Sequence, residues 1–161
     1  MTPRPERPGL HPSYGISTDE EGLLPWSWVS EQMEGSRNYW VGTTRPDGRP
    51  HAMPVWGVWL GDTLFFSTGD GSVKARNLAA DPRVAVHLES GDEAVMLEGT
   101  AERAALGPDV HGRVVAAYGA KYGMTPDDLP GPDGWYILRP VVVFAWQERD
   151  FPRTATRWRF D

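Results

Sequence analysis

The chain has 161 residues, of which 40% are hydrophobic and 24% are charged. This length and this balance predict one globular domain with a sizeable core, and they exclude a disordered chain. No apolar run approaches the roughly 20 residues that a membrane-spanning helix needs.

Charge and cysteine content narrow the classes of function. The net charge is -6 and the pI is about 5.2, whereas nucleic acids and anionic membranes favour basic surfaces. We therefore expect a small-molecule ligand, with no nucleic acid and no membrane as partner. The absence of cysteine excludes disulfides, thiolate metal sites and cysteine nucleophiles, so redox chemistry would need a bound cofactor.

The N-terminal residues differ in composition from the rest of the chain. Proline and glycine recur through residues 1–25, a pattern that neither a helix nor a paired strand tolerates. We expect a flexible N-terminal arm here, free or lying across a neighbouring subunit, and a single domain over residues 26–161. The first twelve residues lack the apolar segment of a secretory signal, so the expected location is cytoplasmic, and the abundance of Arg, Ala, Gly and Pro is typical of a bacterial, GC-rich genome.

The first half of the domain shows short helical and strand patterns in alternation. A helix is expected over 27–35, with Trp26, Val29 and Met33 on one face. Strands follow, separated by turn residues, over 38–44, 51–60 and 63–68. Ser72 is a good N-cap for a helix over 73–80, which Asp81-Pro82 ends.

The second half contains more strands and one longer helix. Strands are expected over 84–89 and 93–104, a helix over 108–122, a Pro/Gly/Asp loop over 123–134, and strands over 135–146 and 155–160. About six antiparallel strands with flanking helices predict a mainly β fold, a six-stranded β-barrel. The alternative is an open sheet with helices on one face.

A glycine-rich loop is the sharpest local feature of the sequence. Residues 68–74, with the sequence TGDGSVK, join a strand to a capped helix. Glycines leave backbone N–H groups accessible, a helix N-terminus carries partial positive charge, and Ser72 and Lys74 add a hydroxyl donor and a full charge. The pattern predicts a phosphate cradle, although its spacing differs from that of the nucleotide-hydrolase loop. The alternative is that Ser72 only caps the helix and Lys74 is solvated.

The aromatic side chains offer a second candidate feature. Their planes can sandwich a flat ring system, and the alternative is a role in the core or in a subunit interface. The chain has eight tryptophans, and those on expected strands include Trp56, Trp59, Trp135, Trp146 and Trp158.

Other chemistry finds little support in the residue pattern. The four histidines lack the spacing of metal ligands, so we expect no metal site. No Gly-x-Ser-x-Gly elbow is present, which disfavours serine hydrolysis. The pattern identifies no catalytic acid or base, and His51, Tyr118 and Tyr122 are candidates for testing.

Three segments together resemble the pyridoxamine 5'-phosphate oxidase-like family, the FMN-binding split barrels. They are residues 49–56 (RPHAMPVW), 64–78 (LFFSTGDGSVKARNL) and 81–84 (DPRV). The resemblance covers residues 39–103, and the aromatic segment 143–147 (VFAWQ) is similar to a strand near the family's C-terminus.

The resemblance implies a homodimer whose two cofactor sites lie at the subunit interface. The cofactor would be FMN or the deazaflavin coenzyme F-420, with its phosphate on the loop at 68–74. The strand at 53–56 would give the ring backbone hydrogen bonds, and the aromatic residue at 146 would come from the partner subunit. The cofactor-binding residues carried over by position are Met53, Pro54, Val55, Trp56, Thr68, Ser72, Val73, Lys74 and Trp146.

Departures from the family pattern bear on the substrate. Val73 stands where arginine is frequent, so one charge on the phosphate is missing unless Arg37 or Arg76 substitutes for it. The strand at 51–60 lacks the arginine and lysine of true pyridoxamine phosphate oxidases, and 153–159 (RTATRWR) lacks their Arg-x-His motif. Vitamin B6 phosphate is therefore not the expected substrate, and the sequence is closer to the actinobacterial flavin/deazaflavin oxidoreductase branch.

We therefore expect an enzyme, an oxidoreductase that transfers a hydride between F-420 or FMN and a small conjugated substrate. One alternative is a non-catalytic carrier or sensor that binds FMN, F-420 or another tetrapyrrole-sized ligand. A dimeric structural protein with a decayed site is the other alternative.

Overall fold

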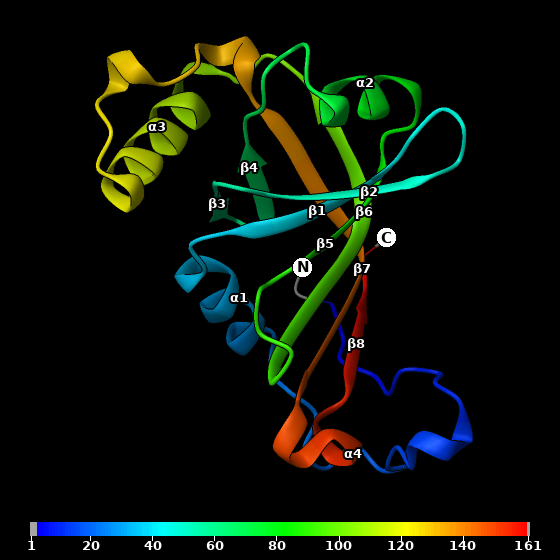
Figure 1. Ribbon diagram of the computed structural model, residues 1–161. Coiled ribbons are helices and arrows are strands. Elements are labelled where there is room, and N and C mark those ends of the chain that lie inside the picture. The colour runs from blue at the N-terminus through cyan, green and yellow to red at the C-terminus, as the bar shows by residue number, and fades with distance from the viewer. Residues whose placement is uncertain (1–2, 161) are drawn as a thin grey trace.

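One strongly curled antiparallel sheet forms the body of the protein (Figure 1). The computed structural model describes residues 3–160. The strand order is β2-β1-β5-β6-β7-β4-β3, with β8 beside β7. The strands are β1 (Tyr39–Thr44), β2 (Pro50–Val55), β3 (Gly57–Leu60), β4 (Thr63–Phe66), β5 (Arg83–His87), β6 (Glu93–Arg103), β7 (Tyr136–Gln147) and β8 (Thr156–Arg159).

Four α-helices flank this sheet, which confirms the predicted mainly β fold with flanking helices. Short 3-10 turns lie in the arm, in the loop at 123–134 and just before α4. The α-helices are α1 (Trp26–Gly35), α2 (Val73–Ala80), α3 (Pro108–Tyr122) and α4 (Phe151–Thr154).

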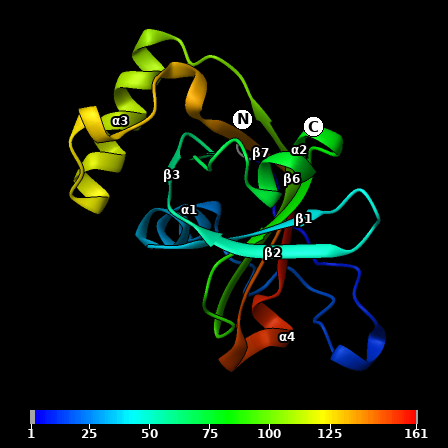
Figure 2. The same ribbon diagram turned by 45° about the horizontal axis from the view of Figure 1, so that its top comes forward.

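The predicted number of six strands was wrong, partly because the run at 51–60 is not one strand. It breaks at Trp56 into β2, which pairs with β1, and β3, which pairs with β4. A Cβ at Gly57 would lie 2.9 Å from the Phe65 carbonyl oxygen, so the backbones approach closely there. The Tyr122 hydroxyl accepts from the Gly57 N–H at 3.0 Å and lies 2.9 Å from the Gly57 carbonyl oxygen. The two end strands of the sheet thus meet at one residue, and the barrel is split between them (Figure 2).

The core has two parts. The larger part fills the concave side of the sheet and is closed by α1, whose Trp26, Val29 and Met33 are buried as predicted. The smaller part lies under α3, where Val114 and the fully buried Trp135 pack among residues of β3, β4 and β7.

Residues 3–25, the predicted arm, lie along β8 and α4. Glu6 forms an isolated bridge with Arg157, and the Leu24 N–H donates to the Thr156 hydroxyl at 2.9 Å. The Arg7 guanidinium donates to four backbone carbonyls, those of Asp19, Glu21, Arg153 and Ala155. Within residues 3–160, no helix is both long and apolar enough to cross a membrane.

Candidate functional site

The glycine-rich loop joins β4 to α2 as the sequence predicts. Ser72 caps α2, its hydroxyl accepting from the Ala75 N–H at 3.1 Å. The Thr68 hydroxyl lies 3.1 Å from that of Ser72, so the two predicted hydroxyl ligands are adjacent. A Cβ at Gly69 or Gly71 would meet no atom within 4 Å, so this backbone is open to a ligand.

Lys74 is the unusual residue of this site. Its side chain lies in the first turn of α2, and the residue is only 8% exposed. Among residues 3–160 it has no hydrogen-bond or ion-pair partner, and burial lowers the pKa of its amine. A largely desolvated ammonium gains most from an anionic partner. The burial of this side chain favours the predicted phosphate role over the alternative of a solvated Lys74.

His51 faces the same region from β2. It is opposite Thr43 in the sheet register, and the Thr43 hydroxyl accepts from Asn77 of α2 at 3.0 Å, which fixes the helix over these strands. His51 Nδ1 is buried without a partner within the described residues. Burial and the positive charges of Arg45 and Lys74 lower the pKa of this imidazole.

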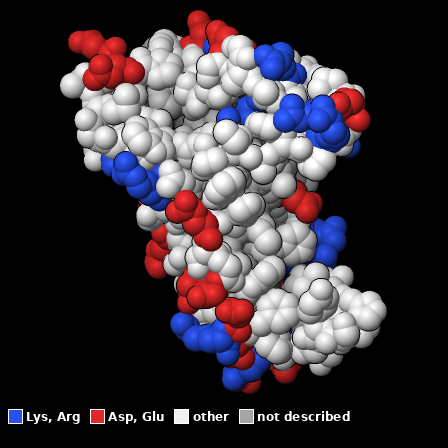
Figure 3. All heavy atoms as spheres, in the orientation of Figure 1, with Lys and Arg blue, Asp and Glu red and all other residues white. Residues whose placement is uncertain are grey.

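These groups fit a phosphate. The loop supplies hydroxyls and open backbone, and α2 supplies its N-terminus. Lys74 and His51 Nδ1 supply polar atoms that have no hydrogen-bond partner within residues 3–160. Lys and Arg side chains also gather at the upper right of the surface in Figure 3, over α2 and the β1–β2 hairpin. Val73, carried over by position, is an apolar, half-buried residue and adds no charge.

The strand predicted to run beside a ring is an edge strand. β2 pairs only with β1, so its other edge has no strand partner among the described residues. Met53 is 48% exposed, Trp56 is 38% exposed and Pro54 is exposed, whereas the Val55 side chain is buried in the core. Backbone groups and three side chains of this segment are thus open to a ligand.

Trp56 is part of an aromatic stack at the end of β2. Its ring is nearly parallel to that of Tyr122, with centroids 4.5 Å apart and an interplanar angle of 6°. The Arg37 guanidinium carbon lies 5.2 Å from the Trp56 centroid and 5.6 Å from that of Tyr122. The end of α3 thus contacts the end of β2, and the surface at this contact is aromatic with one positive charge from Arg37.

Trp146 lies far from the loop of its own chain. It is ten residues along β7 from Tyr136, which pairs with Phe66 next to the loop, and ten residues of strand span about 33 Å. Trp146 packs edge-on against Phe151, with centroids 5.2 Å apart. Trp59, Trp135 and Trp158 are core residues, at 4%, 0% and 0% exposure.

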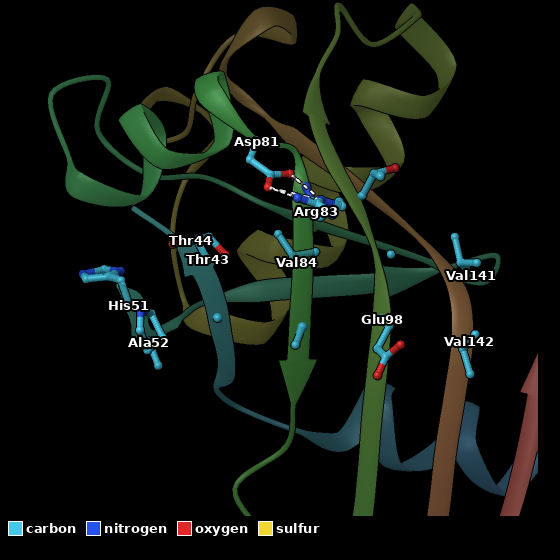
Figure 4. Close-up of a pocket in the computed structure, with 15 residues that line it drawn as sticks. Thr43, Thr44, His51, Ala52, Asp81, Arg83, Val84, Glu98, Val141 and Val142 are labelled. Atoms are coloured by element: carbon cyan, nitrogen blue, oxygen red, sulfur yellow. Dashed lines mark hydrogen bonds and ion pairs between the residues drawn. The ribbon is translucent and has the colours of Figure 1, made fainter. Parts of the chain in front are cut away.

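The sequence reasoning missed a groove on the outer face of the sheet. It has a volume of about 850 Å³ and crosses β2, β1, β5, β6 and β7. Figure 4 shows His51 and Val141 at opposite ends and the Asp81–Arg83 ion pair above. The side chains of its floor are mostly small, among them Gly42, Ala52 and Ala85. Gly42 and Ala85 each lie between two buried residues of their strands, and this alternation was the available signal in the sequence.

Metal chemistry has no visible basis in the part of the chain that the structure describes. No group of three or more His, Asp or Glu side chains there is arranged to hold a metal ion. His87 instead stacks on Trp40, with centroids 6.1 Å apart, and His111 lies 3.1 Å from the Pro130 carbonyl oxygen.

A curled, split antiparallel barrel with a glycine-rich loop before a capped helix defines a class of proteins, and comparison identifies the family. The family model described as pyridoxamine 5'-phosphate oxidase matches residues 29–147. The chain therefore belongs to this family, as the resemblance predicts. No curated protein matches the sequence significantly.

Solved structures with this fold have diverse names. A conserved hypothetical protein from Mycobacterium tuberculosis has a TM-score of 0.67 and 24% identity, over 83% of this chain and 91% of that one. A structure named F-420 reductase has a TM-score of 0.54 and 25% identity, over 71% of this chain and 94% of that one. HutZ, the heme storage protein from Vibrio cholerae, has a TM-score of 0.59 and 18% identity, over 73% of this chain and 90% of that one.

Proposed function

We propose that the protein is an oxidoreductase that uses F-420 or FMN to transfer a hydride to or from a small conjugated substrate. The observation that carries the proposal is Lys74, a largely buried lysine with no hydrogen-bond or ion-pair partner within residues 3–160, which lies beside the open loop at the capped end of α2. A coenzyme phosphate would supply the missing negative charge. When bound, the coenzyme would supply the redox chemistry.

The residues of this chain would bind and orient. Thr68, Ser72 and Lys74 would hold the phosphate, and the free edge of β2 at Met53 to Trp56 would align the ring. The Trp56–Tyr122 stack would form a flat wall that excludes water from one end of the site. Arg37 is available at this wall for a polar or anionic group of the substrate.

We favour F-420 over FMN. F-420 carries an anionic tail beyond its phosphate, and tail binding needs positive charge outside the loop. Arg45 lies near His51, and the Arg76 guanidinium donates to the Gly71 carbonyl oxygen at 2.6 Å. These two arginines thus lie near the groups that would hold the phosphate. The likeness to a structure named F-420 reductase also favours this coenzyme.

We further propose a homodimer with two sites at the interface. The outer face carries a groove with an apolar floor and the 51% exposed Val141, a surface suited to a second copy. The stretch of β7 between Trp146 and the loop of its own chain is about 33 Å long. We therefore expect the Trp146 side chain to contact the coenzyme in the partner's site.

The first experiment is a parallel titration of the purified protein with F-420 and with FMN, followed by tryptophan and coenzyme fluorescence. We expect F-420 to bind more tightly. When the bound coenzyme is supplied in its chemically reduced form, we expect added quinones or enones to reoxidise it by accepting its hydride. Failure of both coenzymes to bind would overturn the proposal.

A second candidate function is a non-catalytic carrier or sensor with the same fold. The structural similarity to HutZ, which is named a heme storage protein, favours this candidate. Hemin is therefore included in the titration. Tight binding of hemin, or of a coenzyme that no acceptor oxidises, would support this candidate instead.

A further inference from the structure

A second groove, of about 590 Å³, lies between α1, β3 and α3. It shares no lining residue with the loop at 68–74 or with β2. Its walls are apolar at Val58, Leu60, Ala117 and Ala120. The charged side chains that line it are Glu34, Arg113 and Lys121.

Lys121 is half-buried at one end of this groove. Its Nζ donates to the Tyr39 hydroxyl oxygen at 2.8 Å and to the Gly57 carbonyl oxygen at 3.1 Å. Both acceptors are uncharged, and within residues 3–160 no carboxylate oxygen lies within 4.0 Å of this amine. An ammonium has three N–H donors, so one donor of Lys121 is left for another acceptor.

The surrounding charges do not compensate Lys121. Arg37 repels it, and this charge together with burial lowers the pKa of Lys121 to about 8. Burial raises the pKa of Tyr39 and of Tyr122, so both phenols are neutral near pH 7. Glu34, on the opposite wall, forms no ion pair within the described residues.

Arg113 adds a second cation to the same wall of α3. It is two helical turns before Lys121, lines the groove and is exposed, and it has no ion-pair partner among residues 3–160. The groove therefore has two cations to one anion, and neither cation is neutralised by the protein.

We propose that this groove binds a small organic carboxylate. The carboxylate would accept the free N–H of Lys121 and pair with Arg113, while an apolar body of a few carbons would cover Val58, Leu60 and Ala117. The volume of the groove is in the range of small-ligand sites, and its apolar walls favour an organic acid over a bare inorganic anion. None of the residues that line this groove is assigned to the coenzyme site, so the proposal does not depend on the coenzyme assignment.

The test uses the purified full-length chain without added coenzyme. Hexanoate and hexan-1-ol are titrated separately at pH 7 by isothermal titration calorimetry. We expect hexanoate to bind at least ten times more tightly than hexan-1-ol, because only hexanoate combines the charge and the apolar body. Equal binding of the two compounds, or no binding of hexanoate, overturns the proposal.

Three substitutions then locate the binding. Lys121→Gln should weaken hexanoate binding at least tenfold. Arg113→Gln should weaken it severalfold. Glu34→Gln should strengthen it severalfold by removing the one repelling charge. Arg113 and Glu34 are exposed, so their variants test the site even where Lys121→Gln alters packing. Unchanged affinity in all three variants means binding elsewhere and overturns the assignment.

The pH dependence is an independent readout. Hexanoate affinity should fall between pH 7 and pH 9 as Lys121 loses its proton, and Lys121→Arg should bind hexanoate with little dependence on pH. A wild-type affinity that is constant over this range excludes Lys121 as the binding group.

Discussion

Lys74 shows how one residue directs the interpretation of a site. A lysine of an ordinary surface would extend into water, whereas this one is 92% buried and has no partner within residues 3–160. A phosphate bound at the loop, as we propose, would compensate the charge of this largely desolvated amine.

Replacement of Lys74 tests this interpretation directly. We expect Lys74→Ala to weaken coenzyme binding by about 1.5–3 kcal/mol, the scale of a hydrogen bond to a charged group. The dissociation constant from the fluorescence titration measures the loss. Arg4→Ala is the control, because the Arg4 side chain is 82% exposed in the arm and should leave binding unchanged. An unaltered dissociation constant for Lys74→Ala would remove the phosphate assignment.

At the scale of elements, the junction of β2 and β3 depends on α3. The Tyr122 hydroxyl contacts the Gly57 N–H at 3.0 Å and donates to a carbonyl oxygen, that of Arg37 at 2.7 Å or that of Gly57 at 2.9 Å. One phenol thus holds the helix end, the strand break and the end of the α1–β1 connection together. Its loss would leave a backbone donor without a partner.

Tyr122→Phe removes only this hydroxyl. We expect the free energy of unfolding to fall by about 1–3 kcal/mol, the cost of leaving part-buried polar groups unsatisfied. Urea denaturation measures the change. Tyr14→Phe is a matched control, because Tyr14 is 58% exposed and its hydroxyl has no hydrogen bond within the described residues. Equal stability of the two variants would contradict the role of Tyr122.

The other anchor of α3 is Lys121, and it links stability to pH. Its pKa in the folded protein is about 8, below the ordinary 10.5, so the unfolded chain binds more protons between these values. The free energy of unfolding, taken relative to Lys121→Gln, should therefore rise with pH between about 8 and 10. Urea titrations at pH 7.5, 8.5 and 9.5 measure this difference. A flat or falling difference would show that Lys121 keeps its ordinary pKa.

Elements with local signals were predicted, and features that depend on distant residues were not. Ser72 caps α2, and Gly123 ends α3 in a left-handed conformation with its N–H bonded to the Gly119 carbonyl oxygen. The break at Trp56 was missed because it requires Tyr122, which is 66 positions away in the sequence. The loop was predicted from its glycines and Ser72, whereas the lack of a partner for Lys74 depends on how α2 lies over β1 and β2.

At the scale of the whole molecule, the proposed dimer would complete the candidate site. The loop lies at one end of the β4–β7 pairing, and Trp146 lies at the far end of β7 on the strand face opposite to the buried Val143 and Ala145. A two-fold related copy on the outer face, over the groove of about 850 Å³, would bring the far end of one chain toward the loop of the other.

Mixed dimers test whether the site is shared. Lys74→Ala and Trp146→Ala should each reduce coenzyme binding when purified alone. If each site combines a loop from one chain with Trp146 from the other, a mixed dimer has one doubly altered site and one intact site. Unfolding and refolding the two variants together at equal amounts should then restore about a quarter of the wild-type sites, because half of the dimers are mixed. Fluorescence titration counts them, with each variant refolded alone as control. Mass spectrometry shows whether the mixture contains the mixed dimer. If it does and no sites are recovered, either both residues belong to the site of the same chain or Trp146 lies outside the site.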